Sequence, residues 1–295
     1  MSIEKNIPLA NFSSLKIGGP ADFFVRVFGE KDLIAAADFA RRKKLRILIG
    51  GSGTNCLFCD AGFRGIFLKI ENRGLAFAHK KIGRRKTEFA QISAGENLAK
   101  FVAAAAKRNW EIAGLAGIPG TVGGAIAGNV GAHGCEISDI FQSARIFDLR
   151  RGKFFTVRKN FFQFFYRDSA LKNQNNFVIF SATFARPQKT FWQKFRAKFS
   201  RKISPAEEIS QIQKKRAARY PFGAGAGSFF KNPPGKFAGE LLEKSGVKNL
   251  TRGGAVVSSE HANFFLNSKN ATAADFLNLA VEARRAVFKK FKIEL

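Results

Sequence analysis

Residues 116–134 have the sequence AGIPGTVGGAIAGNVGAHG, in which seven of nineteen positions are glycine and none carries a formal charge. A glycine inside a regular element costs roughly 0.5–1 kcal/mol relative to alanine, so a segment this rich in glycine needs a compensating role. Three roles are available. The segment could span a membrane, form a flexible linker, or lie with its backbone close against a ligand.

The segment does not have the composition of a membrane span. Residues 112–132 contain no charged side chain and are long enough for one. However, Pro119 interrupts them and glycine dominates them. A linker does not fit either, because aliphatic residues that favour burial recur among the glycines: Ile112, Leu115, Ile118, Val122, Ile126 and Val130. The pattern favours a packed segment, with either a bound cofactor or a neighbouring helix or strand against its backbone.

A second glycine loop lies upstream. Residues 45–49 predict a buried strand that leads into the loop GGSGTN at 50–55. Converging backbone N–H groups and hydroxyls in such a loop are typical of phosphate binding. The loop is neither a Rossmann fingerprint, because Cys56 stands at the third glycine position, nor a Walker A loop, because it lacks Gly-Lys-Ser/Thr. Together the two loops predict one long ligand that carries a diphosphate.

The composition is that of a globular chain. With 295 residues, 45% of them hydrophobic and 24% charged, it is long enough for two or three domains or subdomains. A formal net charge of +28 suggests nucleic acid or anionic small molecules as partners. Part of this excess lies in residues 150–172 and 186–219, without a zinc finger, an RGG repeat or an RNP signature. Solvated basic faces are the simpler explanation, and no specific nucleic-acid partner is expected.

Three cysteines give no disulfide framework and indicate a reducing compartment. Cys56 and Cys59 form a CxxC without a second pair, so we expect ordinary buried thiols and no metal site. The first residues lack the apolar stretch of a signal peptide, and the expected location is the cytoplasm, without membrane insertion.

Periodicity and capping signals predict the main elements. Helices are expected at 31–42 and 96–108, and in basic segments after Pro187, where Pro205 suits the first position of a helix. Residues 272–275 form a capping box that opens a last helix of about eighteen residues. Strands are expected at 45–49, 65–70, 88–94 and 176–184. The composition shift near residue 186 predicts a domain boundary.

With these pieces in order, the chain resembles the UDP-N-acetylenolpyruvoylglucosamine reductases, also called UDP-N-acetylmuramate dehydrogenases. The likeness begins at residues 14–22, SLKIGGPAD, and continues nearly to the end of the chain. Its further motifs are GSGTN (51–55), AGIPGTVGGA (116–125), NVGAHGCEISD (129–139), YRDS (166–169), AGSFFKNPPG (226–235) and EHANFFLN (260–267). Each motif alone is weak, but six in family order are specific.

The resemblance implies the fold and the cofactor. The expected class is α+β, with a two-subdomain FAD-binding fold of the vanillyl-alcohol-oxidase type followed by a C-terminal α/β substrate-binding domain. The FAD-binding region is placed at residues 1–186, with subdomains of about 1–72 and 73–186, and the substrate domain at 187–295. The FAD contacts implied by the motifs come from both glycine loops: Gly51, Ser52, Gly53, Thr54, Asn55, Gly117, Ile118, Pro119, Gly120, Thr121, Gly123 and Gly124.

The resemblance also implies the reaction. In the family, NADPH reduces FAD and leaves, and UDP-N-acetylglucosamine enolpyruvate then receives hydride and a proton. Arg167 matches the catalytic arginine, whose guanidinium stays charged and can bind a carboxylate through two hydrogen bonds. Ser228 matches the serine that donates the proton. The substrate contacts implied are Tyr166, Lys231, Asn232, His133 and His261.

Three departures from the family pattern stand out. The approach to the serine is AGAGS at 224–228 where relatives often have PSAGS, and His133 replaces a tyrosine. A family glutamate in a Pro-Glu-Val-like context lies beyond Leu295, and Glu294 does not match it by register. Truncation, reduced activity or another carboxylate, such as Glu240 or Glu260, would each account for this.

The family exists with and without a tyrosine-bearing loop over the substrate. Only 60 residues separate Asp168 from Ser228, with Tyr220 the one tyrosine between them, which predicts the form without the loop. The basic residues of 214–219, together with Lys231, are then expected to face the diphosphate of the substrate.

Other functions are compatible with parts of the pattern. Another FAD-dependent sugar or alcohol oxidoreductase of the same fold would share the glycine loops but not the AGSFFKNP segment at 226–233. A basic nucleic-acid-binding protein would explain the net charge but not the paired loops. The favoured prediction is a monomeric, NADPH-dependent FAD enzyme.

Overall fold

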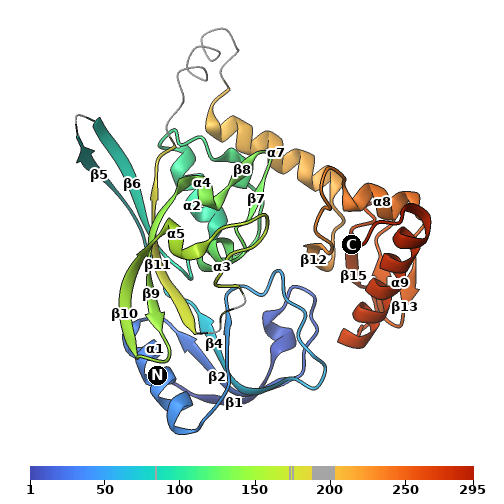
Figure 1. Cartoon of the computed structure of the whole chain (residues 1–295), viewed down its shortest axis with the longest axis horizontal. Coiled ribbons are helices and arrows are strands. Elements are labelled where there is room, and N and C mark those ends of the chain that lie inside the picture. Colours follow the sequence, from blue (N-terminus) through green and yellow to red (C-terminus); the bar gives the residue numbers. More distant parts are fainter. Residues whose placement is uncertain (84, 173, 175, 188–202) are drawn as a thin grey trace. The chain divides into compact units, whose positions relative to one another are not determined.

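The computed structural model describes residues 1–83, 85–172, 174, 176–187 and 203–295 (Figure 1). The chain forms two compact units that are interleaved along the sequence. The first consists of Met1, residues 26–51 and residues 68–215, and the second of residues 2–25, 52–67 and 216–295. The predicted functional division at residue 186 stays a prediction, since the interleaved units do not test it.

The first unit is built on a five-stranded antiparallel sheet in the order β10-β9-β11-β6-β5. Figure 1 shows β9, β10 and β11 side by side. Strands β5 and β6 precede the glycine stretch in sequence, and β9, β10 and β11 follow it. The stretch therefore connects two parts of the chain that join in one sheet. Their bounds are β5 (Leu75–Ile82), β6 (Arg85–Ser93), β9 (Phe141–Asp148), β10 (Lys153–Arg158) and β11 (Phe177–Ala185).

Helices and short elements complete this unit. Asn97 caps α2, because its side chain accepts hydrogen bonds from the N–H groups of Ala99 and Lys100. Buried aromatic rings pack beneath α2, where Phe101 stacks on Phe184 and meets Trp110 edge to face. The bounds are α1 (Glu30–Arg42), α2 (Leu98–Ala106), η2 (Ala113–Leu115), α3 (Val122–Ala127), β7 (Gly131–Ala132), β8 (Cys135–Glu136), α4 (Ile137–Ile140) and α5 (Lys159–Phe162).

A smaller sheet has the order β1-β2-β4-β3, and the division between the two units crosses its strands β2 and β4. Pairing of β1 with β2 is antiparallel, and the short helix η1 separates them in sequence. The bounds are β1 (Glu4–Pro8), η1 (Leu9–Phe12), β2 (Pro20–Val27), β3 (Ile47–Gly50) and β4 (Phe63–Ile70).

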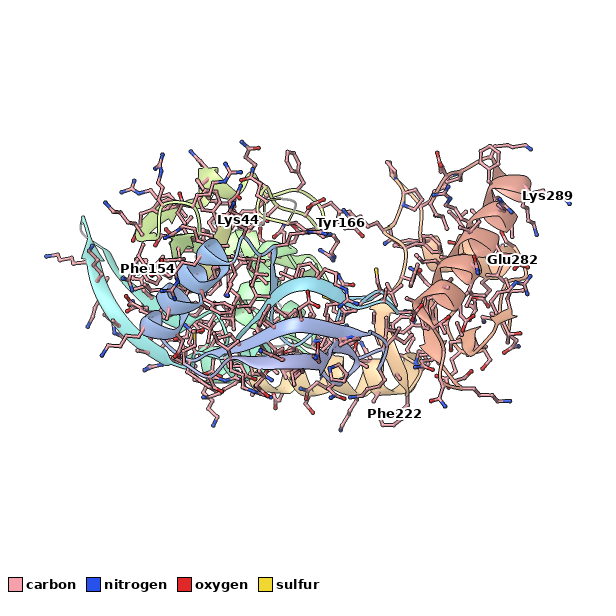
Figure 2. All side chains as sticks on the ribbon, turned by 90° about the horizontal axis from the view of Figure 1, so that it is seen from below. Lys44, Phe154, Tyr166, Phe222, Glu282 and Lys289 are labelled. Atoms are coloured by element: carbon pink, nitrogen blue, oxygen red, sulfur yellow. The ribbon has the colours of Figure 1, made fainter. Side chains whose placement is uncertain are left out.

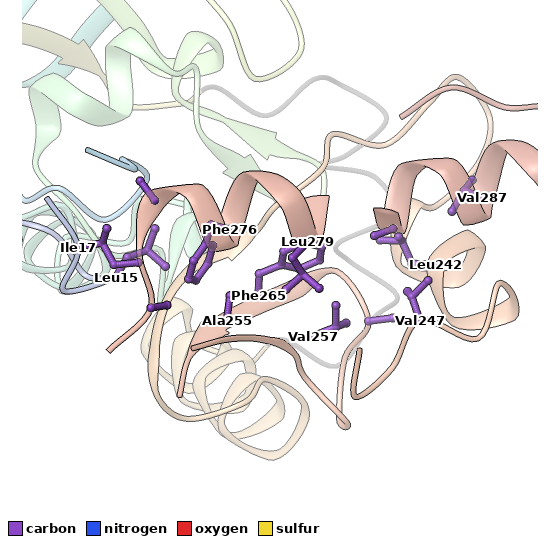
Figure 3. Close-up of a cluster of buried hydrophobic side chains, with 14 of the residues drawn as sticks. Leu15, Ile17, Leu242, Val247, Ala255, Val257, Phe265, Phe276, Leu279 and Val287 are labelled. Atoms are coloured by element: carbon purple, nitrogen blue, oxygen red, sulfur yellow. The ribbon is translucent and has the colours of Figure 1, made fainter. Parts of the chain in front are cut away.

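The second unit contains an antiparallel sheet in the order β12-β15-β14-β13. Apolar side chains of this sheet and of two helices form one buried cluster, in which Phe265 and Phe276 are both fully buried (Figure 3). Burying such a ring contributes roughly 1.5–3 kcal/mol. The bounds are β12 (Ala224–Ser228), α8 (Ala238–Lys244), β13 (Thr251–Arg252), β14 (Ala255–Val257), β15 (Phe264–Asn267) and α9 (Ala273–Phe291), and α7 (Pro205–Arg219) crosses the division between the units.

These elements agree with the predicted class, since antiparallel sheets and helices make an α+β chain. The predicted capping box is confirmed, because Thr272 accepts from the N–H of Asp275 and α9 follows. Pro205 is the first residue of α7, as predicted. No helix among the described residues is both long and apolar enough to cross a membrane.

Candidate active site

The two glycine loops meet at Gly51 and Thr121. A Cβ atom on Gly51 would overlap the Thr121 hydroxyl oxygen and lie 3.3 Å from its Cγ2. Thr121 also caps α3, because its hydroxyl accepts the N–H of Gly124 at 3.2 Å. The side chain of Lys69 donates to the carbonyl oxygen of Gly51 at 3.2 Å. The start of the first loop is therefore fixed against the second.

Tight packing explains several glycines of the stretch that decided the prediction. A Cβ on Gly123 would lie 3.0 Å from the Cβ of Ala94, and one on Gly131 would lie 2.8 Å from the Cγ of Glu136. Gly117 and Gly120 have φ angles of +71° and +128°, a region that L side chains rarely adopt. Close packing against neighbouring elements therefore explains part of the glycine content of the stretch. The alternative explanation, a bound cofactor, applies to the remaining glycines.

Each loop, taken by itself, carries donor groups of the kind that bind a diphosphate cofactor such as FAD. The backbone N–H groups of Ser52, Gly53 and Gly117 donate no hydrogen bond to any part of the chain that the structure describes. Ser52 and Gly117 are also exposed. Unused N–H groups in glycine loops are the donors that phosphate oxygens require.

Arg167 is held by acceptors from the end of the glycine stretch and from Glu136, which follows it. Its Nη1 donates to Glu136 Oε1 at 3.0 Å and to the carbonyl oxygen of Asn129 at 3.4 Å, and its Nη2 donates to the carbonyl oxygen of Gly131. The backbone of Arg167 has a φ of +53°, within a turn closed by reciprocal bonds between Phe165 and Asp168. The guanidinium is thus oriented by the fold.

Aromatic residues flank this arginine. Tyr166 is half exposed, and its ring lies 4.9 Å from the Arg167 guanidinium carbon (Figure 2). Phe165 is exposed beside it. His133 is exposed in the turn between β7 and β8, with a φ of +50°. Tyr166 stays a predicted substrate contact, with its ring against the guanidinium of its neighbour Arg167.

Ser228 ends strand β12 in the second unit and is exposed. Gly227 precedes it with a φ of +77°, and no atom lies within 4 Å of a Cβ placed there. The segment after it is fixed by Asn263, whose side chain both accepts the N–H of Phe230 and donates to its carbonyl oxygen at 2.9 Å. The serine hydroxyl therefore stands at the edge of a rigid segment.

The other predicted substrate contacts also lie in the second unit. Asn232 uses its side-chain oxygen to accept the N–H of Ala238, the first residue of α8, at 3.0 Å. Lys231 is exposed. His261 accepts the N–H of Asn263 through Nδ1 at 3.1 Å, so the neutral ring carries its proton on Nε2. Burial and the charge of Arg219 lower the pKa of His261.

Glu240 and Glu260, named as substitutes for the family glutamate, and Glu294, which does not match it by register, differ in their surroundings. Glu240 forms an ion pair with Lys244 at 2.6 Å, and Glu294 forms one with Arg284 at 3.7 Å. Glu260 is exposed, and its N–H donates to Ser258. None of these contacts identifies a carboxylate that takes the place of the family glutamate.

The prediction of buried thiols in the CxxC motif is wrong. Cys56 and Cys59 are exposed, because the segment between β3 and β4 is a surface loop and contributes only Phe58 to the core. Burial, with the nearby acidic residues Asp139, Glu136 and Glu208, raises the pKa of Cys135 to about 11, so this thiol stays protonated at neutral pH. Among the described residues no three potential metal ligands cluster.

Comparison with known proteins gives the family. Residues 220–295 match the model of the UDP-N-acetylenolpyruvoylglucosamine reductase C-terminal domain, and residues 21–158 match that of an FAD binding domain. A UDP-N-acetylenolpyruvoylglucosamine reductase from Lachnoclostridium phytofermentans is 36% identical over 98% of this chain and 89% of its own. The chain belongs to the UDP-N-acetylenolpyruvoylglucosamine reductase family.

Further relatives agree with this assignment. A UDP-N-acetylenolpyruvoylglucosamine reductase from Desulforamulus reducens is 38% identical, over all of this chain and 91% of its own. The crystal structure of such a reductase from Thermus caldophilus superposes with a TM-score of 0.76 at 26% identity, covering this whole chain and 97% of that one. The predicted resemblance is confirmed, as is the combination of an FAD-binding fold with a separate C-terminal domain.

The sequence did not single out two residues that the structure places at Arg167. Asn129 and Glu136 were quoted only as parts of the motif NVGAHGCEISD, yet both contact the arginine. The available signal was a polar side chain at the end of a glycine-rich segment, and a carboxylate within seven residues of it. Neither feature indicated Arg167 as the partner.

Proposed function

We propose that this chain catalyses the NADPH-dependent reduction of UDP-N-acetylglucosamine enolpyruvate to UDP-N-acetylmuramate, a step in the synthesis of peptidoglycan precursors. Membership of the reductase family and the match to an FAD binding domain over residues 21–158 support this proposal. FAD, when bound, supplies the electron-transfer chemistry, accepting hydride from NADPH and passing it to the enolpyruvyl group. We further propose that the enzyme acts as a cytoplasmic monomer.

The observation that carries the proposal is the orientation of Arg167. A guanidinium has five N–H bonds, and the hydrogen bonds of Arg167 to the chain use both on Nη1 and one on Nη2. Its Nε–H and the second Nη2–H have no acceptor in the described part of the chain. These two donors can bind the substrate carboxylate and stabilise the negative charge that develops next to it.

Ser228 is the proposed proton donor. Its hydroxyl is exposed at the end of β12, where the neighbouring Gly227 leaves space for a substrate. A hydroxyl is a weak acid, so its proton can move only to a strongly basic carbanion-like centre, and the resulting alkoxide needs nearby donors. Lys231, exposed three residues further on, is proposed to contact the diphosphate.

The loops around FAD would act through their backbone. The N–H groups of Ser52, Gly53 and Gly117 are proposed to bind phosphate oxygens, and the contact between Gly51 and Thr121 fixes the start of the first loop. Thr54 and Asn55 of that loop, and Ile118, Pro119, Gly123 and Gly124 of the second, stay proposed cofactor contacts. The form without a substrate loop also stays a proposal, because residues 188–202 lie outside the described ones.

Three measurements on the purified protein test the proposal. The visible spectrum, taken before and after reconstitution with FAD, should show flavin bands that are released on denaturation. NADPH should reduce the bound flavin, and UDP-N-acetylglucosamine enolpyruvate should reoxidise it with formation of UDP-N-acetylmuramate. A colourless protein that takes up no FAD would contradict the assignment, and flavin reoxidation by another sugar or alcohol product alone would favour the alternative oxidoreductase.

A further inference from the structure

We infer that Glu136 is a positioning residue for Arg167, and that Asn129 holds Glu136 in place for this purpose. The inference rests on the proposed function, because it concerns how Arg167 is presented to the substrate carboxylate. All the residues involved lie within the first compact unit.

The carboxylate of Glu136 is fixed at both oxygens. Oε1 accepts from Arg167 Nη1 at 3.0 Å, and Oε2 accepts from Asn129 Nδ2 at 2.9 Å. The exposed fractions of the Arg167 and Glu136 side chains are 32% and 34%, so the pair is neither buried nor fully solvated. A surface ion pair contributes little because both side chains must be ordered at an entropic cost. Here the fold orders one partner in advance.

Asn129 orders that partner. It is 1% exposed, and its side chain joins three segments of the chain. Its Nδ2 donates to Glu136 and also to the carbonyl oxygen of Phe165 at 2.9 Å, while its Oδ1 accepts the N–H of Ser138 at 3.1 Å. Because the Phe165 carbonyl belongs to the turn that contains Arg167, one amide fixes both the carboxylate and the backbone of the arginine.

The arrangement leaves one part of the guanidinium for a ligand. Glu136 and two backbone carbonyl groups occupy Nη1 and one Nη2–H, so the group cannot rotate without losing all three bonds. Without Glu136 only the neutral carbonyl acceptors of Asn129 and Gly131 would remain. Small displacements of an oriented catalytic group cost far more in rate than in binding, and a shift of about 1 Å can cost about 100-fold.

Glu136→Gln is the appropriate variant, because it keeps the side-chain length and removes the charge. The glutamine amide has only one oxygen, so its NH₂ group would face either the Asn129 NH₂ or the Arg167 guanidinium. One of the two hydrogen bonds is then lost. Flavin reduction by NADPH should be unchanged. The rate constant for flavin reoxidation at saturating enolpyruvyl substrate should fall about tenfold or more. The dissociation constant of that substrate should change less than about threefold, because weaker orientation of Arg167 is offset by the removal of a negative charge beside the carboxylate.

Two further variants separate positioning from a merely structural role. In an Arg167→Lys background, Glu136→Gln should have almost no additional effect on reoxidation, because the group through which Glu136 acts has been replaced. Glu30→Gln is the matched control. It removes the carboxylate of another ion pair in the same unit, the one with Arg145, and should leave both half-reactions at the rates of the unmodified chain.

The outcomes are distinct. The inference would be overturned if the reoxidation rate constant of Glu136→Gln lies within twofold of that of the unmodified chain. It would also be overturned if Glu136→Gln lowers this rate constant by the same factor in the Arg167→Lys background as in the unmodified chain. A Glu136→Gln variant that binds no FAD, and so shows neither half-reaction, would indicate that Glu136 is needed for folding. This result would also overturn the inference. If the unmodified chain itself fails to reoxidise its flavin with the enolpyruvyl nucleotide, the proposed function has failed instead.

Discussion

Gly51 lies against Thr121 so closely that a Cβ atom at Gly51 would overlap the threonine hydroxyl oxygen. That hydroxyl is already in use, since it accepts the N–H of Gly124 and caps α3. The two glycine loops are therefore not independent, because a change at Gly51 in the first displaces the cap of α3, the helix within the second.

Gly51→Ala should weaken FAD binding about tenfold, because the loop or the Thr121 side chain must move to admit the methyl group, at a typical cost of about 1–3 kcal/mol. The dissociation constant can be measured by flavin fluorescence on reconstitution of the apoprotein. Gly128→Ala is the control from the same stretch, with a φ of −92° and no atom closer than 3.5 Å to the added Cβ. Equal loss of affinity in both variants would contradict this explanation.

Ser228→Ala should leave flavin reduction by NADPH nearly intact and slow reoxidation by the enolpyruvyl nucleotide by orders of magnitude, since the serine proton is needed only in the second half-reaction. Stopped-flow absorbance separates the two halves. Ser259→Ala, at another exposed serine of the same unit, provides the control. If Ser228→Ala lowers both rates equally, the serine has a structural role.

The sequence was informative where local signals are strong. The capping box at Thr272, Pro205 at the start of a helix and the long helix at 31–42 all appear in the structure, because each depends on neighbouring residues. Strands such as β9 and β10 were not predicted. β10 pairs with β9, which directly precedes it, but neither strand shows the regular alternation of apolar and polar residues that would have predicted it, and the other partner of β9, β11, lies further along the chain.

The same distinction holds at the candidate site. Arg167 and Ser228 were found through motifs, whereas the contacts of Arg167 with Asn129 and Glu136 join positions more than thirty residues apart. The exposure of Cys56 and Cys59 was also missed, because the composition of a loop does not tell which of its residues face the core. Long-range contacts of this kind require the fold.

Lys231→Ala should raise the KM for the UDP-sugar substrate about tenfold and change kcat little, because the proposed contact with the diphosphate is made equally in the ground and transition states. Steady-state kinetics at several salt concentrations provide the measurement, and the KM of the unmodified chain should depend more strongly on salt than that of the variant. Lys236→Ala, at an exposed lysine of the same loop, is the control. A variant that lowers kcat at constant KM would place Lys231 at the reacting atoms instead.

Acid stability should depend on the cap of α9. Hydrogen bonds from the N–H groups of Thr272 and Gly254 lower the pKa of Asp275 in the folded chain. The folded state therefore favours the ionised carboxylate. Its contribution is complete above the unfolded pKa, which is about 3.9, and is lost as the pH falls through the lower folded pKa.

Asp275→Asn should accordingly lower the unfolding temperature at neutral pH, and its unfolding temperature should fall less than that of the unmodified chain between about pH 5 and pH 3. Thr272→Ala removes the other half of the box, in which the hydroxyl accepts the N–H of Asp275 at 3.0 Å, and should cost about 1 kcal/mol at all pH values. Thermal unfolding followed by circular dichroism across this range measures both effects. Parallel pH curves for Asp275→Asn and the unmodified chain would show that the carboxylate of Asp275 does not contribute to acid stability.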